Sequence, residues 1–260
     1  MKKLKFVFFP VIVLVLSFFW LFPQIPGLLW AEQHGYARYG KGLFSDSTIA
    51  PGQLFRLNRS VARAETKIKD FWGSHEGKGI IIFCQKESEF AGLCGSGKGA
   101  GCSIGTPWRS WIVLNADGLN EDVIAHEMCH IELMTRLGWW NVKTDIPTWL
   151  DEGLALQVDD RFVSEKDSIQ RYIDYKAELE MYSNGNQWEI PLTELETNKQ
   201  FFGDEYRTRL AYLTAATEVS KILTKTSKKE FLQTLERDRT FVPRGSTFVP
   251  EGTKPRKPMP

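Results

Sequence analysis

The sequence predicts an α+β fold placed behind a single N-terminal transmembrane helix. Three observations lead to this prediction: residues 6–30 carry no charge, two short β-branched runs lie at 79–84 and 111–115, and helical spacing of apolar residues dominates the second half. The 260 residues include 42% hydrophobic and 13% aromatic side chains, which are sufficient for a sizeable core and argue against a chain disordered throughout.

The first 30 residues are interpreted as a membrane anchor. Three lysines among the first five residues precede the uncharged segment 6–30, which exceeds the roughly 20 apolar residues needed to cross a bilayer. The lysines predict a cytoplasmic N-terminus, so the rest of the chain is expected to lie outside the cytoplasm. A cleaved signal peptide is the alternative, although its best cleavage position, after Ala31, has an unsuitable Leu29 two residues earlier.

The remaining chain divides into a connector, a domain and a tail. Residues 31–53 contain Gly and Ser and are expected to connect the anchor to a domain at 54–239. Residues 240–260 contain FVPRGST, FVPEGT and GTKPRKPMP, a composition rich in Pro and Gly that predicts a disordered tail.

Within the domain, each expected element follows from a local pattern. Apolar residues at helical spacing predict a helix at 54–72, β-branched runs predict strands at 79–84 and 111–115, and repeated glycines between them predict a loop at 91–107. A long helix is expected to begin after Asn120 and to end at Gly138. Further helices are expected at 147–159, 165–182, 204–223 and 228–237.

Charge and cysteine content restrict the partners. The 33 Lys and Arg residues nearly balance the 32 Asp and Glu residues, whereas a nucleic-acid binder usually carries a basic excess, so nucleic acid is not an expected partner. Four cysteines are too few for a disulfide scaffold. If the domain is extracytoplasmic, Cys94 and Cys102 can close a small loop, and Cys84 is an alternative partner for either one.

The most specific motif is HEMCH at residues 126–130, inside the predicted long helix. Residues i and i+4 share one face of a helix, so His126 and His130 can bind one zinc ion at nitrogen–metal distances of about 2.0–2.1 Å. Glu127 points about 100° away around the helix. It can reach a water on the open side of the metal, where a general base is needed.

A carboxylate at the start of the next predicted helix completes this set. Glu152, in the segment WLDEGLA, lies 22 residues beyond His130 and can turn back toward the first helix. Two histidines and one glutamate leave the fourth zinc position for water, which is the catalytic form of such a site. One zinc ion per chain is therefore expected.

HEMCH followed by WLDEGLA resembles the gluzincin zinc metallopeptidases, which include the thermolysin-like and aminopeptidase-like enzymes. The resemblance is strong over residues 111–160 and weaker over 54–235. It implies a zincin-like metalloprotease domain, zinc at the three predicted ligands, Glu127 as the catalytic base, and the strand at 111–115 beside a cleft for a peptide or protein substrate.

The resemblance also implies a downstream residue that stabilises the oxyanion. Tyr212 and Tyr206 are the candidates, and Tyr212 is preferred because its helical context is closer to that of the family. The thermolysin-like branch has an Asp four residues after the ligand Glu, where this chain has Leu156. The candidates to support a ligand histidine instead are Asp151, Asp159 and a backbone carbonyl.

The expected function is zinc-dependent hydrolysis of peptide bonds by a membrane-anchored, extracytoplasmic metallopeptidase. The chain lacks the long N-terminal region with which the aminopeptidases bind a free amino terminus, so an endopeptidase is preferred over an exopeptidase. The alternative is a non-catalytic binding protein of zincin fold at the membrane surface. Intact Glu127 and Glu152 favour the enzyme, because loss of catalysis usually erodes the base first.

Overall fold

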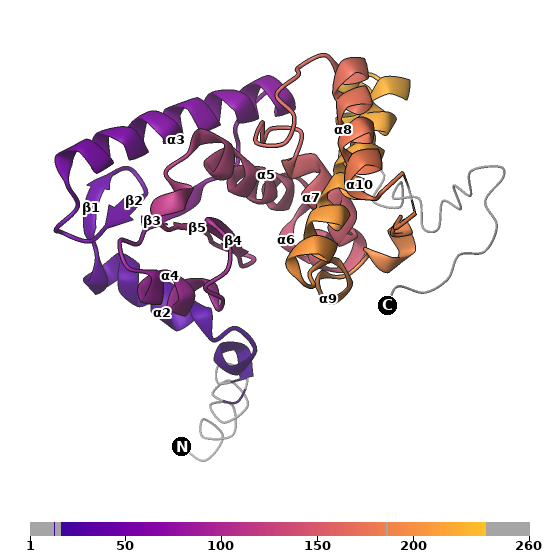
Figure 1. The fold of residues 1–260 in the computed structure, drawn as a ribbon. Coiled ribbons are helices and arrows are strands. Elements are labelled where there is room, and N and C mark those ends of the chain that lie inside the picture. The colour runs from indigo at the N-terminus through magenta and orange to yellow at the C-terminus, as the bar shows by residue number, and fades with distance from the viewer. Residues whose placement is uncertain (1–12, 14–16, 186, 238–260) are drawn as a thin grey trace.

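A mixed five-stranded sheet packed between helices forms the centre of the computed structural model, which describes residues 13, 17–185 and 187–237 (Figure 1). The predicted α+β class is confirmed. The strand order is β1-β2-β3-β5-β4. The strands are β1 (Ala37–Gly40), β2 (Leu43–Ser45), β3 (Gly79–Phe83), β4 (Gly101–Gly105) and β5 (Ser110–Leu114).

The central strands β2, β3 and β5 run parallel, and the two edge strands run antiparallel to their neighbours. β4 pairs with β5 over its whole length, from Gly101 opposite Leu114 to Gly105 opposite Ser110. This pairing places the start of β4 beside the end of β5, from which the chain leads directly into the HEMCH helix.

The helices account for most of the remaining structure. They are α2 (Gln24–Trp30), α3 (Pro51–Trp72), α4 (Glu87–Cys94), α5 (Glu121–Leu137), α6 (Trp139–Asp145), α7 (Thr148–Ala155), α8 (Ser168–Tyr182), α9 (Asn198–Phe201), α10 (Glu205–Lys225) and α11 (Lys228–Arg237). A π-helical turn at Ala31–Gly35 and short 3₁₀ turns at Ala116–Gly118 and Leu192–Glu194 complete the elements.

Alternate residues of the parallel strands serve two separate cores, because successive side chains of a strand point to opposite faces. Ile112 and Leu114 of β5 belong to the larger core with α3, α5 and the helical half of the molecule. Trp111 and Val113 belong to a smaller core with α2 and α4. Figure 1 shows α3 and α5 on one side of the sheet, α2 and α4 on the other, and α7, α8 and α10 gathered beside α5.

The structure differs from the sequence prediction in two segments that were expected to be irregular. The expected connector at 31–53 contains β1 and β2, and the expected loop at 91–107 contains the end of α4 and all of β4. These strands are three to five residues long, and β1 and β4 lie at the sheet edges. Pairing with a neighbouring strand stabilises them, and this pairing is not visible in a local pattern.

The predicted single-pass membrane localisation is wrong. No helix in the described part of the chain is both long and apolar enough to span a membrane. Two apolar residues near the end of the expected anchor, Ile25 and Leu28, are buried in the smaller core, together with Ala31, Phe90 and Trp111. They pack against protein, and α2 is only seven residues long. Residues 1–12, 14–16 and the predicted tail at 240–260 lie outside the described residues.

The mutation Leu28→Ala tests this packing. Leu28 is fully buried, so truncation should lower the free energy of unfolding by about 2–5 kcal/mol through lost burial and a cavity. Leu21→Ala is the matched control, because Leu21 is 63% exposed and its truncation should change stability by less than about 0.5 kcal/mol. Urea unfolding of both variants measures the difference. Equal effects would show that α2 is not part of the core.

Candidate metal centre

Helix α5 carries the HEMCH residues through the middle of the molecule. Asn120 caps it as expected, since its Oδ1 accepts a hydrogen bond from the Asp122 backbone N–H at 2.7 Å. Most of the helix is buried, including His126, Glu127 and His130. Buried polar side chains require partners, so the environment of these three residues determines what they can do.

The structure brings the three predicted ligands together. His126 Nε2 lies 3.2 Å and His130 Nε2 lies 3.7 Å from the same carboxylate oxygen of Glu152. One ligand atom from each residue falls within 4.8 Å of the other two, and all three side chains are buried. Zinc ligands about 2.0–2.2 Å from a shared ion would be separated by similar distances. The three residues can therefore hold a metal ion.

Glu152 reaches this position because α7 packs tightly between α5 and α10. Gly153 makes the approach possible: a Cβ at this position would lie 2.5 Å from Val219 Cγ2 and 2.7 Å from the Ala215 carbonyl oxygen. Any side chain would push α7 away from α10 and displace Glu152. The glycine after the ligand thus has a packing role that the motif alone does not explain.

The two aspartates that were candidates for supporting the ligands each contact a different histidine. His130 Nδ1 donates to Asp151 Oδ1 at 2.6 Å. His126 Nδ1 lies 3.3 Å from Asp159 Oδ2 in an ion pair. A carboxylate can only accept, so the hydrogen bond to Asp151 places a proton on His130 Nδ1. His126 Nδ1 has no hydrogen-bond partner among the described residues and faces Asp159 only at ion-pair distance, and both rings turn Nε2 toward Glu152. This orientation is the one that a metal at Nε2 requires.

The third candidate, a backbone carbonyl, is not needed. At the position where the family has an Asp, the Leu156 side chain is buried, and its carbonyl accepts from Tyr175 Oη at 2.9 Å and from Arg171 Nη2 at 2.7 Å. These donors satisfy the Leu156 carbonyl, which lies just past the last turn of α7. Helix α7 ends at Ala155 rather than at the predicted residue 159. The early end lets Asp159 turn back to His126.

The acidic surroundings favour positive charge on both imidazoles in the metal-free protein. Burial opposes the charge, but contacts with Asp159 and Glu152 outweigh it and raise the pKa of His126 to about 10. For His130, burial is outweighed by Asp151 and Glu152, which raise its pKa to about 9. A cation, either proton or metal, is therefore strongly stabilised between these carboxylates.

Metal binding should consequently release protons. At pH 7 both imidazoles are protonated, because their pKa values of about 10 and 9 lie above the pH, whereas a metal requires a free Nε2 lone pair. Up to two protons should leave per metal ion, and apparent affinity should rise with pH until the histidines are neutral. Calorimetric titration in two buffers of different ionisation enthalpy measures the number released. A value of zero at pH 7 would contradict the charge state inferred for the site.

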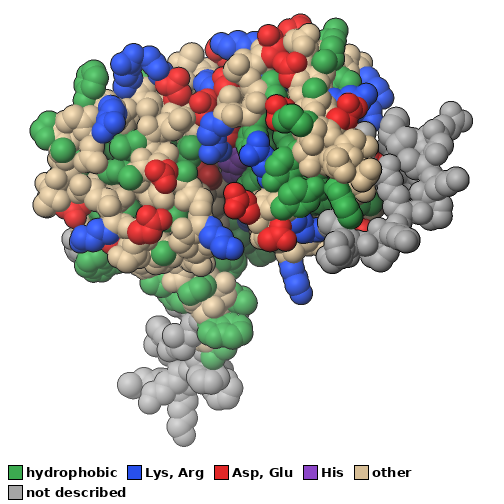
Figure 2. Space-filling model, in the orientation of Figure 1, with side chains coloured by type: hydrophobic (Ala, Val, Ile, Leu, Met, Phe, Trp, Pro, Cys, Tyr) green, Lys and Arg blue, Asp and Glu red, His purple; other side chains and the backbone are tan. Residues whose placement is uncertain are grey.

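Glu127 faces a cavity beside the three ligands. The cavity has a volume of about 210 Å³, and its lining includes His126, Glu127 and residues 99–101. A Cβ at Gly101 would lie 3.1 Å from Glu127 Cγ, so the start of β4 passes close to this carboxylate. Figure 2 shows a hollow near the middle of one face, with a histidine side chain visible at its base.

Of the two candidate tyrosines, Tyr212 lies at the site. It lines the same cavity as Glu127, and its ring centroid is 6.2 Å from that of His126. Burial, followed by the charges of Glu152 and Glu127, raises the pKa of Tyr212 well above its usual value, so the hydroxyl keeps its proton. Tyr206 is 40% exposed, and its hydroxyl donates to the Tyr182 carbonyl at 3.1 Å instead.

Arg161 is a charged residue of the cavity that the sequence did not indicate. It lines the cavity and binds Asp159 through its Nε, at 2.9 and 3.0 Å from the two carboxylate oxygens, and through Nη2 at 2.5 Å. It lies outside both motifs, in the turn after α7. No local pattern distinguishes it from other surface arginines, and its role depends on how this turn folds back.

The cysteines do not contribute to the metal site. Cys94 and Cys102 form a disulfide, as one of the open pairings anticipated, and they flank the segment from which Gly99 and Gly101 line the cavity. Cys84 and Cys129 are free and buried. Although Cys129 lies within HEMCH, the potential metal-binding group in the described residues contains His126, His130 and Glu152 without it.

Comparisons with protein-family models, curated proteins and solved structures found no match to this chain. The site is therefore assigned from the positions of its own residues, and membership of the gluzincin family stays a prediction.

Proposed function

We propose that the protein is a zinc-dependent peptidase of the gluzincin type. The observation that carries this proposal is the convergence of His126, His130 and Glu152 on one buried point, with Glu127 beside them on a cavity. Two imidazole nitrogens and one carboxylate are the ligand set of catalytic zinc sites, and three protein ligands leave a position for water. Calcium and magnesium prefer oxygen ligands, so this site suits them less.

Each residue of the proposed site has its own role in peptide hydrolysis. Zinc, when bound, supplies a Lewis acid that acidifies a water and polarises a carbonyl group. Glu127 accepts the proton of the attacking water and then delivers it to the leaving amine. Tyr212 keeps its proton and can donate a hydrogen bond to the oxyanion. Asp151 and Asp159 hold the two histidines in the orientation that exposes Nε2.

The edge strand β4 supports an endopeptidase. It is the last strand in the sheet order, so its outer edge is not paired with another described strand, and its first residue, Gly101, lines the cavity. An extended peptide can add to such an edge through backbone hydrogen bonds. This mode of binding does not require a free amino terminus and would bring an internal peptide bond past Glu127.

A peptide-library experiment tests the proposed activity. The purified full-length chain should cleave internal bonds of library peptides, lose this activity with a zinc chelator, and regain it when zinc is returned. Cleavage that survives removal of the metal would contradict the proposal. Stoichiometric metal binding without cleavage would favour the alternative, a non-catalytic binding protein.

Tyr212→Phe tests the oxyanion role. Loss of the hydroxyl should lower kcat about 10²–10³-fold, the usual cost of removing one oxyanion donor, with little change in KM or zinc content. Tyr206→Phe is the matched control, because its hydroxyl binds the Tyr182 carbonyl away from the cavity, and its kcat should stay close to that of the parent. If both variants keep full activity, another group stabilises the oxyanion.

A further inference from the structure

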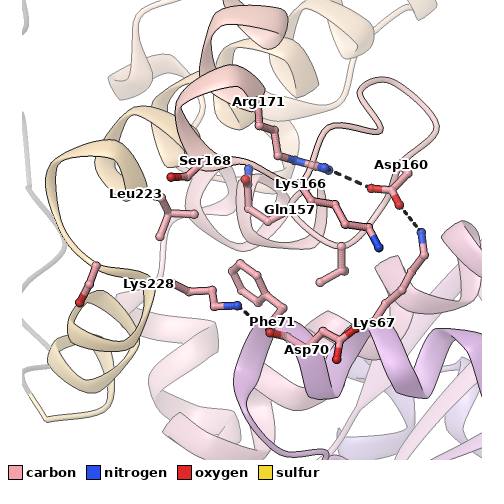
Figure 3. Close-up of a pocket in the computed structure, with 12 residues that line it drawn as sticks. Lys67, Asp70, Phe71, Gln157, Asp160, Lys166, Ser168, Arg171, Leu223 and Lys228 are labelled. Atoms are coloured by element: carbon pink, nitrogen blue, oxygen red, sulfur yellow. Dashed lines mark hydrogen bonds and ion pairs between the residues drawn. The ribbon is translucent and has the colours of Figure 1, made fainter.

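The structure contains a second cavity, with a volume of about 320 Å³. It shares no lining residue with the metal-centre cavity beside Glu127. It is bounded by α3, the turn after α7, the start of α8, the end of α10 and the start of α11 (Figure 3). Its size is at the lower end of the roughly 300–1,000 Å³ that small-molecule sites occupy. None of the residues of the proposed reaction lines it.

Four basic side chains line this cavity, Lys67, Lys166, Arg171 and Lys228, against two acidic ones, Asp70 and Asp160. Lys67 and Arg171 both contact Asp160, at 2.6 and 3.1 Å, and Lys67 also contacts Asp122. Their charges are thus largely compensated within the protein.

The other two ammonium groups are not compensated in this way. Lys228 Nζ donates to the backbone carbonyl of Asp70 at 2.6 Å, which is a neutral acceptor, and its ammonium lies 5.5 Å from the centroid of the Phe71 ring. Within the described residues, neither Lys228 nor Lys166 has a carboxylate within ion-pair distance. Two cationic donors therefore border the cavity and can bind an anion.

Three apolar side chains also line the cavity, beside the polar residues Gln157, Ser168 and Ser227. Phe71, Val158 and Leu223 are each at least 91% buried and line the cavity from three different elements. A simple inorganic ion would leave this apolar surface uncovered, and a purely apolar molecule would leave the ammonium groups without a partner. The lining is complementary to a molecule with an anionic end and a short apolar body.

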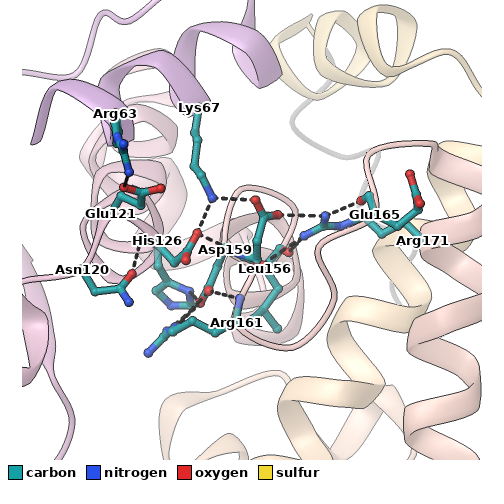
Figure 4. A network of polar contacts seen from close by, with 12 residues as sticks. Arg63, Lys67, Asn120, Glu121, His126, Leu156, Asp159, Arg161, Glu165 and Arg171 are labelled. Carbon is teal, nitrogen blue, oxygen red and sulfur yellow. Dashed lines mark hydrogen bonds and ion pairs between the residues drawn. The ribbon is translucent and has the colours of Figure 1, made fainter. Parts of the chain in front are cut away.

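The cavity shares a structural wall with the metal centre. From the turn after α7, this cavity is lined by Gln157, Val158 and Asp160. The metal-centre cavity is lined by Leu156 and Arg161 of the same turn. Asp160 contacts both Lys67 and Arg171 on one side of the turn. Figure 4 shows how polar contacts connect Lys67 and Arg171 with Asp159 and His126 on the other side.

Arg171 is the fixed part of this wall. It is 95% buried, and its Nη2 donates to the carbonyl oxygens of Leu156 and Asp159 at 2.7 and 3.1 Å. Nη1 donates to the Glu165 carbonyl at 2.6 Å, while Nε has no hydrogen-bond partner in the described structure. The guanidinium thus holds in place the turn that lies between the two cavities.

We propose that this cavity binds a small amphipathic organic anion, with its carboxylate or phosphate head group on Lys166 and Lys228 and its apolar body against Phe71, Val158 and Leu223. The site is separate from the substrate cleft of the proposed peptidase. Its occupation can be measured whether or not the protein cleaves peptides.

Calorimetric titration of the full-length protein tests the proposal with defined probes. We expect saturable binding of 4-phenylbutyrate or of phenyl phosphate, and the stronger of the two serves as the preferred probe. Acetate should bind at least about tenfold more weakly because it has no apolar body to bury, and 4-phenylbutylamine should not bind because its charge is reversed.

The double variant Lys166→Gln/Lys228→Gln should weaken binding of the preferred probe at least about tenfold, the effect of losing one charge-assisted hydrogen bond or more. Lys225→Gln/Lys229→Gln is the matched control, since both lysines are exposed nearby and neither lines the cavity. Thermal unfolding of both double variants checks that they fold like the parent. Absence of saturable binding by either anion, equal binding of the amine, or equal loss in the control would overturn the proposal.

Discussion

Glu127→Gln should keep its bound zinc and its fold while losing nearly all peptidase activity. The amide has almost the same shape as the carboxylate but cannot accept a proton from water. A general base contributes about 10²–10⁴-fold, so kcat should fall by at least that factor. Zinc content should be unchanged, because Glu127 is not among the three residues whose ligand atoms converge. Elemental analysis and peptide turnover of the same preparation measure both quantities.

Glu121→Gln is the matched control for this change. It removes a carboxylate from the first turn of the same helix, where Glu121 forms an ion pair with Arg63 at 2.7 Å, about a third exposed. A surface pair of this kind contributes about 0–1 kcal/mol to stability, so activity and zinc should both remain. Loss of zinc from Glu127→Gln would mean that Glu127 is a ligand and not a base.

Glu152→Gln should release the metal. The carboxylate is the only acidic ligand of the proposed site, and both histidine Nε2 atoms face the same oxygen of Glu152. A neutral amide binds zinc far less well and leaves two protein ligands. Zinc affinity should therefore fall by more than the roughly 10–100-fold that loss of a supporting partner costs, and activity should fall with it. Competition with a chromogenic chelator measures the affinity.

Asp151→Asn provides a graded comparison at the neighbouring position. Asp151 contacts His130 Nδ1 at 2.6 Å and is not part of the converging set, so its loss should lower zinc affinity only about 10–100-fold. We expect zinc affinity to be highest in the parent protein, lower in Asp151→Asn and lowest in Glu152→Gln. Full zinc occupancy in Glu152→Gln would show that the third ligand has been assigned to the wrong residue.

The candidate ligands were predictable from the sequence because their geometry is largely local. His126 and His130 are separated by one helical turn, which fixes their relation once the helix forms. Glu152 was predictable from its place in a second motif. Asp159 was one of three candidates to support a ligand histidine, but its pairing with His126 could not be chosen from the sequence. Asp159 reaches His126 through the turn that follows the early end of α7, and that end depends on donors from Tyr175 and Arg171 in the next helix.

The N-terminal segment shows the opposite case, in which a strong local pattern was misleading. A continuous apolar run is compatible both with a bilayer and with a protein core. Ile25 and Leu28 lie on one face of the short helix α2, and Ala31 continues this face in the π-helical turn, in one apolar cluster with residues of α4 and β5. Composition cannot distinguish the two environments, because the decision depends on whether the sheet offers an apolar surface of matching shape.

Anomalous diffraction at the zinc absorption edge, from crystals of the purified full-length protein, tests the central claim most directly. We predict one peak per chain within about 2.0–2.2 Å of His126 Nε2, His130 Nε2 and a carboxylate oxygen of Glu152. No peak at this position in zinc-supplied crystals, or a peak bound by other residues, would contradict the claim that these three side chains form a catalytic zinc site.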